Sequence, residues 1–310
     1  MSSIQTGCLI TMEDLLETDL FRQAKDRIIS ATEKITKSNS VAIFATADLD
    51  SIVSLAFLES AMIDSKIPYT RKILPSVAHQ PKREQYDFST SSHLVISIEQ
   101  FEETWEQDQI NDEGRVRVVP LSVSVSHPNS EKQHNGALDV VIQCAAIASL
   151  IAPNGPRVRR LRSLSGSGQW LRQSLDNSYD PVYTKIRDIL QNEGSIRVLP
   201  LPEINNPDTQ MIPNFPTRIL DRLTKKWPKM DFDQRKQAMS ELALPTLSVG
   251  KISTPRLEEL LWFRIVISEN ELDLHSQIYR AKSLWPDEKD TSKSHAASVL
   301  KSLISEGRLS

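Results

Sequence analysis

The sequence is short of several features that mark particular classes of protein. Its 310 residues include only two cysteines, Cys8 and Cys144, and these lie too far apart in sequence to suggest a disulfide framework or a metal-ligand pair. Basic residues number 37 against 40 acidic ones, a net charge of -3, so no overall field favours nucleic acid or membrane binding. No apolar run reaches the length of a membrane span, and no basic, apolar leader is seen. We therefore expect a soluble, cytoplasmic protein.

The stretch from Ser40 to Pro75 holds the clearest structural pattern. An apolar run over 41–44 leads into a loop of small residues that contains Asp48 and Asp50, then into a helical apolar pattern and a second short strand. This order predicts a right-handed βαβ unit whose loop opens at the carboxyl end of its first strand. Ligands and catalytic groups gather at that edge of open α/β sheets, so we expect any functional site there.

Further elements continue the alternation of helix and strand. An amphipathic pattern from Thr11 onwards predicts one long helix, or two broken near Asp19, beside the sheet. A continuous apolar run over 93–98 predicts a strand covered on both faces. Residues 116–125 predict another strand, which Pro120 places at an edge or makes irregular. With the almost uncharged, buried helix that we expect over 137–151, the pattern indicates an α/β fold whose sheet is mostly parallel and flanked by helices.

Proline and glycine divide the second half of the chain. We expect the serine- and glycine-rich segment 163–168 to be a flexible loop. Five prolines within the seventeen residues 200–216 indicate a linker. Beyond it, the apolar spacing predicts a mainly helical region. The expected organisation is an α/β domain over 1–200 with its N-terminal amphipathic helix, a proline-rich linker over 201–216 and a smaller helical C-terminal region over 217–310.

Several short sequence features accompany this order of elements: the pair Asp48-x-Asp50, the segment IPYTRKIL over 67–74, the Asn135-Gly136 turn signal, the Gly166-x-Gly168 loop and the segment ILQNEGSIRV over 189–198. Together they resemble the DHH phosphoesterase superfamily, most closely its archaeal RecJ-like branch. The resemblance covers about residues 20–200 and depends on element order and a single motif. It implies a sheet of about five strands, the number found in that family.

The family resemblance implies a particular chemistry. Active members bind two divalent metal ions, usually manganese, through aspartates and histidines placed at several strand ends. The two ions activate a water molecule and neutralise charge on the phosphate that is cleaved. Their ligands must therefore be hard oxygen donors and imidazoles on one edge of the sheet. Mn²⁺ or Mg²⁺ is the cofactor that residual activity would require.

The first two motifs of the family are only partly present. The pattern His-x-Asp-x-Asp-Gly corresponds to residues 46–51, which keep Asp48 and Asp50 but have lost the histidine and the glycine. The second motif is an aspartate just after a buried strand. It falls at Ser97, or at Glu99 if the register moves by two residues. Asp48, Asp50 and Glu99 are therefore the only candidates for catalytic carboxylates at these two motifs.

The remaining family motifs are missing. The Asp-His-His triplet falls at residues 120–122 or 125–127, and the aspartate is absent in both registers. The aspartate of a Gly-Asp pair falls at Gln169, and an amide is a poor substitute for a carboxylate. Active members also carry a glycine-rich segment that grips nucleic acid in a second domain. After residue 216 this chain has Gly250 and Gly307 as its only glycines, so that grip is also missing.

We infer a pseudoenzyme from these losses. Asp48 and Asp50, with Glu99 in doubt, cannot hold a bridged pair of cations in the required geometry. We expect no catalytic residue and no cofactor, with at most residual metal binding at Asp48 and Asp50. A RecJ relative with a lost active site joins the MCM ring to the GINS complex in the eukaryotic replicative helicase. The resemblance thus implies a non-catalytic replication subunit that binds GINS and helicase subunits and touches single-stranded DNA.

Other interpretations stay open at this point. One is an active manganese-dependent DHH phosphoesterase or single-strand exonuclease with a divergent site built from Asp48, Asp50 and Glu99. Another is an unrelated α/β interaction module in which the Asp48 loop is a coincidence. The two aspartates also suit the N-terminus of the helix that begins near Ser51, where carboxylates are favourable without any metal.

A cluster of arginines follows the Pro153–Pro156 break and provides the candidate nucleic-acid contacts: Arg157, Arg159, Arg160 and Arg162. Arginines beside a glycine-containing loop suit a groove that follows a phosphate backbone. The alternative is a solvated charged face. No aromatic residue alternates with these arginines, and Trp170 is the nearest candidate for base stacking.

Overall fold

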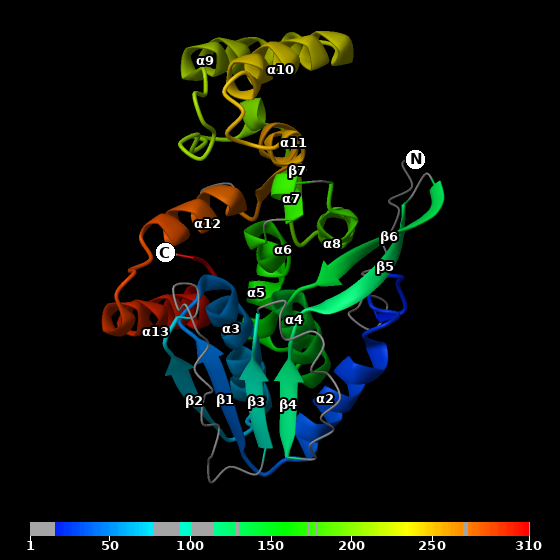
Figure 1. Cartoon of the computed structure of the whole chain (residues 1–310), viewed down its shortest axis with the longest axis vertical. Coiled ribbons are helices and arrows are strands. Elements are labelled where there is room, and N and C mark those ends of the chain that lie inside the picture. The colour runs from blue at the N-terminus through cyan, green and yellow to red at the C-terminus, as the bar shows by residue number, and fades with distance from the viewer. Residues whose placement is uncertain are drawn as a thin grey trace, which may run out of the picture.

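The structure is a computed structural model in which a parallel sheet with its helices forms one end of the molecule and a helical arm forms the other (Figure 1). The segments predicted over 1–15, 77–93 and 101–113 lie outside the described residues. The described residues are 16–76, 94–100, 114–127, 130–172, 174–177, 179–268 and 272–309.

The main sheet has the strand order β2-β1-β3-β4 and is parallel throughout. Its strands are β1 (Val41–Thr46), β2 (Tyr69–Leu74), β3 (Leu94–Ile98) and β4 (Arg115–Val118). Strand β1 lies between β2 and β3 and is buried along its whole length, which explains its unbroken apolar sequence. The α/β class, the βαβ unit and the buried strand after it are confirmed.

Helices cover one face of this sheet (Figure 1). They are α2 (Lys25–Lys37), α3 (Leu49–Ser65), α4 (Val140–Ile151) and α5 (Pro156–Leu161). Every residue of α3 from Ser51 to Met62 is buried, because α4, α5 and α13 pack on it in addition to the strands. Helix α2 begins only at Lys25, after a run of turns, so of the two predicted alternatives the described residues fit the helix broken near Asp19.

Pro120 divides the segment that was predicted as a single strand. Strand β4 ends at Val118, and β5 (Leu121–His127) leaves the main sheet to pair in antiparallel fashion with β6 (Ser130–Leu138). Proline cannot donate a backbone hydrogen bond, so it ends the ladder at the edge of the sheet. Asn135 and Gly136 lie within β6, opposite Ser124 and Val123. The prediction of a turn at these two residues is wrong.

The prediction of a flexible loop over 163–168 is also wrong. These residues belong to the short helix η2 (Arg162–Leu164) and the start of α6 (Ser167–Leu171), and they are buried. Small side chains serve here for close packing: a Cβ atom at Gly168 would lie 2.7 Å from Val141 Cγ2. Two helices follow, α7 (Ser174–Asn177) and α8 (Pro181–Asn192).

The chain then runs out to the arm and returns. Its elements are β7 (Arg197–Leu199), η3 (Leu201–Glu203), α9 (Thr217–Lys226), η4 (Trp227–Lys229), α10 (Phe232–Leu247), α11 (Thr254–Trp262), β8 (Arg264–Val266), α12 (Leu274–Ser283) and α13 (Lys289–Glu306). The helical C-terminal region is confirmed, although β8 pairs with β7 where a helix was predicted. We call α9, η4 and α10 the arm. Among the described residues, no helix is long and apolar enough to cross a membrane.

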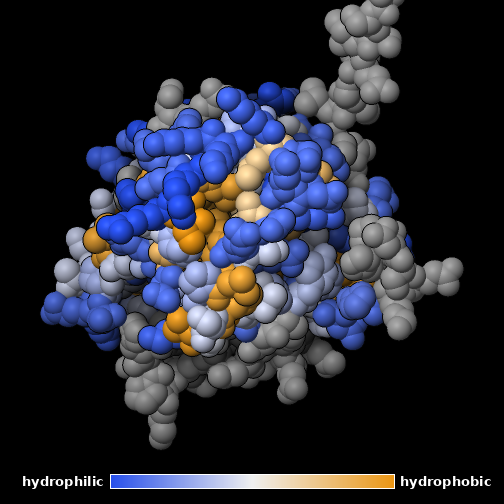
Figure 2. Space-filling model, turned by 90° about the horizontal axis from the view of Figure 1, so that it is seen from above, coloured by the Kyte–Doolittle hydropathy of each residue, from blue (hydrophilic) through white to orange (hydrophobic). Residues whose placement is uncertain are grey.

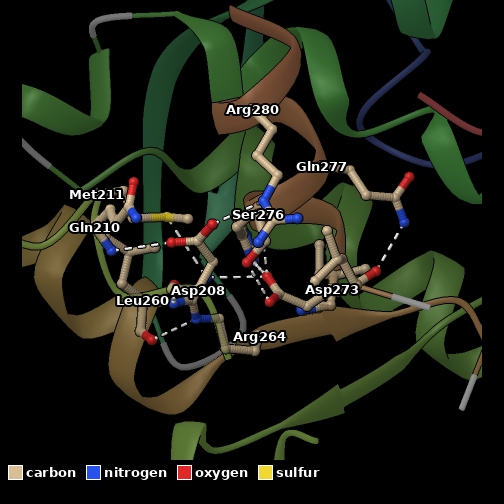
Figure 3. A network of polar contacts seen from close by, with 12 residues as sticks. Asp208, Gln210, Met211, Leu260, Arg264, Asp273, Ser276, Gln277 and Arg280 are labelled. Atoms are coloured by element: carbon tan, nitrogen blue, oxygen red, sulfur yellow. Dashed lines mark hydrogen bonds and ion pairs between the residues drawn. The ribbon is translucent and has the colours of Figure 1, made fainter. Parts of the chain in front are cut away.

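A buried polar network joins the proline-rich segment 201–216 to α12 (Figure 3). The Arg264 side chain is fully buried. It donates from Nη1 to Asp273 Oδ1 over 2.9 Å and from Nη2 to the Asp208 carbonyl over 3.0 Å. Arg280 in turn donates to the Asp208 carboxylate over 2.8 Å. Breaking such a buried pair leaves an uncompensated charge, so this network fixes the C-terminal helices against segment 201–216.

Candidate functional site at the carboxyl edge of the sheet

Asp48 lies directly after β1, where α3 begins. It occupies the N-cap position of α3, yet its carboxylate makes no capping hydrogen bond. Instead Oδ2 accepts a hydrogen bond of 2.9 Å from Gln100 Nε2, and Oδ1 accepts one from the Ser76 hydroxyl. The capping interpretation therefore fails for this side chain. Asp48 connects the loops that follow β1, β2 and β3, which we call the carboxyl edge.

Gln100 is the centre of this edge. It lies two residues beyond β3 and is buried. Its Nε2 donates to Asp48 and, over 3.0 Å, to Thr46 Oγ1, while its Oε1 accepts a hydrogen bond of 2.7 Å from the Ser51 hydroxyl. Both ends of the amide are thus satisfied by the protein itself. The group at the centre of the edge is a neutral amide that holds the first carboxylate in place.

Asp50 lies in the first turn of α3 and is half-buried. Its Oδ1 accepts a hydrogen bond of 2.9 Å from the Ser51 backbone N–H. Burial, and next the neighbouring charge of Asp48, raise the pKa of Asp50 to about 7. A large fraction of this carboxyl is therefore protonated near neutral pH, and a protonated carboxyl is a weak metal ligand.

Glu99 is held by two arginines of β4. Arg117 donates to it from Nε over 3.1 Å and from Nη2 over 2.6 Å, and Arg115 adds a third contact of 3.2 Å. The Ser97 hydroxyl donates over 2.8 Å. Burial opposes ionisation of Glu99, but the hydrogen bonds and charges of these partners outweigh it and lower its pKa. The positive charge opposite this carboxylate comes from the protein.

Asp139 adds a carboxylate that the sequence analysis did not single out. It caps α4, accepting hydrogen bonds of 2.6 Å from Val141 N and 3.1 Å from Ile142 N. Burial raises its pKa to about 6. Gly168 lies directly against it, since a Cβ atom at that position would collide with the Asp139 carboxylate. Gln169, at the place of the fourth family motif, donates to the Ala137 carbonyl.

The C-terminal segment closes over the loop after β1. Trp285 Nε1 donates to the Ala47 carbonyl over 2.9 Å, and the Ser292 hydroxyl of α13 donates to the same oxygen over 3.2 Å. His295 packs edge-on against the Trp285 ring with centroids 5.0 Å apart. The carbonyl that precedes Asp48 is therefore bound by residues about 240 positions away in sequence, as the separations of 238 and 245 show.

This arrangement does not suit a pair of bridged divalent metals. In the part of the chain that the structure describes, no group of three histidines, cysteines, aspartates or glutamates is placed to hold a metal ion. Asp48 accepts from Gln100 and Ser76, and Glu99 faces two guanidinium groups. Bridging sites need several free, ionised oxygen donors. Residual binding of one Mn²⁺ or Mg²⁺ ion at Asp48 and Asp50 stays a prediction.

The predicted nucleic-acid arginines lie on α5 and at its end, and each has a partner within the protein. In chain order, Arg157, Arg159, Arg160 and Arg162 contact Asp64, Asn154, the Ser305 carbonyl and Glu193. Two of the four guanidinium groups belong to ion pairs whose carboxylates are buried, at 2% and 4% side-chain exposure. These contacts attach α5 to α3 and to the end of α8. Their role in nucleic-acid binding stays a prediction.

Several residues of the carboxyl edge were missed from the sequence: Gln100, Arg115, Arg117, Asp139 and Trp285. Two of them carried a usable signal. Gln100 follows a predicted strand as closely as Asp48 follows another, and Asp139 is a residue type favoured at helix N-caps that directly precedes the apolar run from Val140. Arg115, Arg117 and Trp285 carried no such signal, because their places beside the edge depend on contacts between distant segments of the chain.

Comparisons with known proteins give one informative result. No family model matches the chain, and no curated protein matches it. Among solved structures, CDC45 from Entamoeba histolytica matches with a TM-score of 0.51 and 9% sequence identity. The fold resembles CDC45. The match covers 93% of this chain and 68% of that chain. At this identity the likeness to CDC45 shows the fold alone.

Proposed function

We propose that this chain is a non-catalytic subunit of a DNA-replication assembly. In this role it is a scaffold that binds GINS and replicative helicase subunits and contacts single-stranded DNA. The observation that carries the proposal is the Glu99 network, in which Arg115 and Arg117 supply the positive charge that metal ions supply in active DHH enzymes. An edge neutralised in this way supports structure rather than hydrolysis.

The fold supports the same assignment. CDC45 is a replication protein derived from the RecJ branch of the DHH superfamily, and the likeness to it extends over 93% of this chain. The RecJ-like resemblance of the sequence, which depends on element order and the Asp48 loop, points to the same branch independently of that match. Two lines of reasoning therefore favour replication partners.

Co-purification tests the proposed function. The chain would be tagged at its own locus and isolated from native lysate, and its companions identified by mass spectrometry. We expect GINS and helicase subunits to be recovered in amounts comparable to the tagged chain. A tagged protein with an exposed surface change far from the arm, Arg22→Ala (side chain 71% exposed), serves as the matched control. A monomer that brings down none of these subunits would contradict the proposal.

An active phosphoesterase is the second candidate, because Asp48 and Asp50 lie at the edge where the family places its metals. Release of nucleotides from end-labelled single-stranded DNA in the presence of Mn²⁺ would be measured for the wild type and for Asp50→Ala. Asp221→Ala, which changes a solvent-exposed carboxylate of α9, is the control. Activity that disappears only in the Asp50 variant would establish the enzyme and exclude the scaffold proposal in its non-catalytic form.

A further inference from the structure

A groove runs between α9 and α10 on the arm. Its volume is about 570 Å³, and one wall carries Lys225, Lys226 and Lys229. The opposite wall is a face of α10, and Met230 and Ala238 form an apolar part of the surface. The space is sufficient for the side chains of a docked segment. No residue of the carboxyl edge lines it.

The three lysines of this groove are free cations. All three are exposed, and within the described residues no hydrogen bond or ion pair reaches any of them. Arg235 on the same arm differs, because it stacks on Trp227 with its guanidinium carbon 4.9 Å from the ring centroid. The Trp227 N–H in turn donates to Glu203 over 2.7 Å. The arm is thus anchored by its own arginine and tryptophan, while the lysines have no part in holding it.

The α10 wall is a mostly polar stripe with apolar side chains at two positions. Gln234, Gln237, Ala238 and Glu241 line the groove, and their spacing of three and four residues places them on one helix face. One further turn brings Leu244 onto the same face, where it is 62% exposed. Seen from above, the surface at the arm's end of the molecule has apolar residues gathered in a band between hydrophilic ones (Figure 2). From Gln234 to Leu244 the stripe is about 15 Å long.

Helix electrostatics explain only part of this pattern. Lys225 and Lys226 lie in the last turn of α9, where cations are favourable against the helix dipole. Lys229 lies in the last turn of η4, which follows α9 directly, so the same effect applies to it. The dipole gives no reason for an exposed leucine at position 244. Free cations beside exposed apolar side chains offer complementary contacts to a partner that is both acidic and apolar.

We infer that this groove docks an acidic, partly apolar helical segment of another protein. The carboxylates of the segment meet Lys225, Lys226 and Lys229, and its apolar side chains cover Met230 and Leu244, as in other helix-in-groove complexes. Nucleic acid fits less well, because no aromatic side chain lines the groove for base stacking. The inference deepens the proposed scaffold function, on which it rests for taking the occupant to be a protein.

Selection from a random peptide library tests this inference. Phage-displayed peptides of about 15 residues, roughly four helical turns, would be selected on the purified full chain. The affinities of enriched peptides would then be measured by fluorescence anisotropy. The same assay would be run with K225E/K226E/K229E and with K282E/K289E/K301E, which changes the net charge equally on α12 and α13. A labelled poly-dT oligonucleotide is the nucleic-acid probe.

Enriched peptides should be acidic, with apolar residues at helical spacing. They should lose affinity by about tenfold or more in K225E/K226E/K229E and keep it in K282E/K289E/K301E. Peptides without acidic enrichment, or peptides whose binding ignores the groove lysines, would overturn the inference. So would an empty selection, or lysine-dependent binding of poly-dT alone. If GINS co-purifies equally with K225E/K226E/K229E and no peptide depends on the lysines, the groove inference fails while the proposed function stands.

Discussion

The carboxyl edge of the sheet and the groove on the arm differ in how far the protein uses its own polar groups. At the edge, Glu99 faces two arginines and Gln100 is bonded at both ends of its amide. In the groove, three exposed lysines meet no partner among the described residues. Satisfied groups stabilise a fold, whereas unsatisfied surface charges are available for partners. We propose on this basis that the partner-binding surface of this protein lies on the arm.

Substitutions at the carboxyl edge and in the groove test this difference. Changes in groups that the protein uses internally should lower the free energy of unfolding. Changes in the groove should leave the free energy of unfolding unchanged and alter binding.

The largest effect on the free energy of unfolding is expected from pH. It acts through His275, a buried residue of α12. Burial lowers the pKa of His275 from 6.5 to about 4. Between these two values the unfolded chain binds the proton and the folded chain does not, so stability falls as pH decreases from about 6.5 to about 4. The loss is at most about 3 kcal/mol.

Urea unfolding at about pH 7 and about pH 4 measures this loss. His275→Gln cannot be protonated, and it should show a smaller decrease than the wild type over the same interval. Equal decreases in the two proteins would show that His275 is not the group responsible.

The next effect is expected from the arginine pair at the edge. Arg117→Ala removes two hydrogen bonds from Glu99, a carboxylate with only 22% of its side chain exposed. Arg115 remains, so we expect a loss of about 2 kcal/mol in the free energy of unfolding. Chemical denaturation measures it, with Arg22→Ala as the control for an exposed arginine. A loss no larger than that of the control would mean that the Glu99 network does not stabilise the edge.

A methyl group at Gly168 probes the close contact with α4. The added Cβ would lie 2.7 Å from Val141 Cγ2 and would collide with the Asp139 carboxylate. We expect Gly168→Ala to lower stability by about 1.5 kcal/mol through overpacking. Gly166→Ala is the matched control, because the nearest atom to its Cβ, Ile186 Cγ2, is 3.4 Å away. Equal melting temperatures for the two variants would count against the close packing of α6 on α4.

A smaller effect is expected where the C-terminal segment closes over the loop after β1. Trp285→Phe removes the N–H that donates to the Ala47 carbonyl, while Ser292 still donates to the same oxygen. The expected loss is about 1 kcal/mol. Hydrogen exchange at the start of α3 should rise in this variant, and protection identical to the wild type would contradict a role for Trp285 in holding the loop.

The smallest effect on stability is expected in the groove. K225E/K226E/K229E changes only exposed side chains without partners, so its free energy of unfolding should stay within about 0.5 kcal/mol of the wild type. Circular dichroism during denaturation measures this. A loss of several kcal/mol would show that the lysines hold the arm together, and the contrast between the two regions would disappear.

The local elements of the fold were predictable from the sequence. The βαβ unit and the buried helix α4 follow from apolar runs whose lengths match a strand or a helix. Helix α8 was predictable from a similar local signal, since Gly194 lies just beyond it with φ +80°. Each of these features depends on residues close together in sequence.

Pairing between distant segments could not be predicted in the same way. Strand β8 has only three residues, and it forms because β7 lies beside it. Val198 and Ile265, the central pair of the two strands, are 67 residues apart in sequence. The Asp48–Gln100 hydrogen bond joins residues 52 apart. The sequence located the candidate site at the carboxyl edge, but it could not show that an amide and two arginines would occupy the places around its carboxylates.

A manganese soak of crystals of the full chain tests the central claim most directly. Anomalous scattering would be recorded at the manganese edge, and the density around Asp48, Asp50 and Glu99 examined. The account predicts that Glu99 remains bound to Arg115 and Arg117 and that no bridged pair of ions forms. Two manganese ions bridged at these carboxylates, with the arginines displaced, would contradict it.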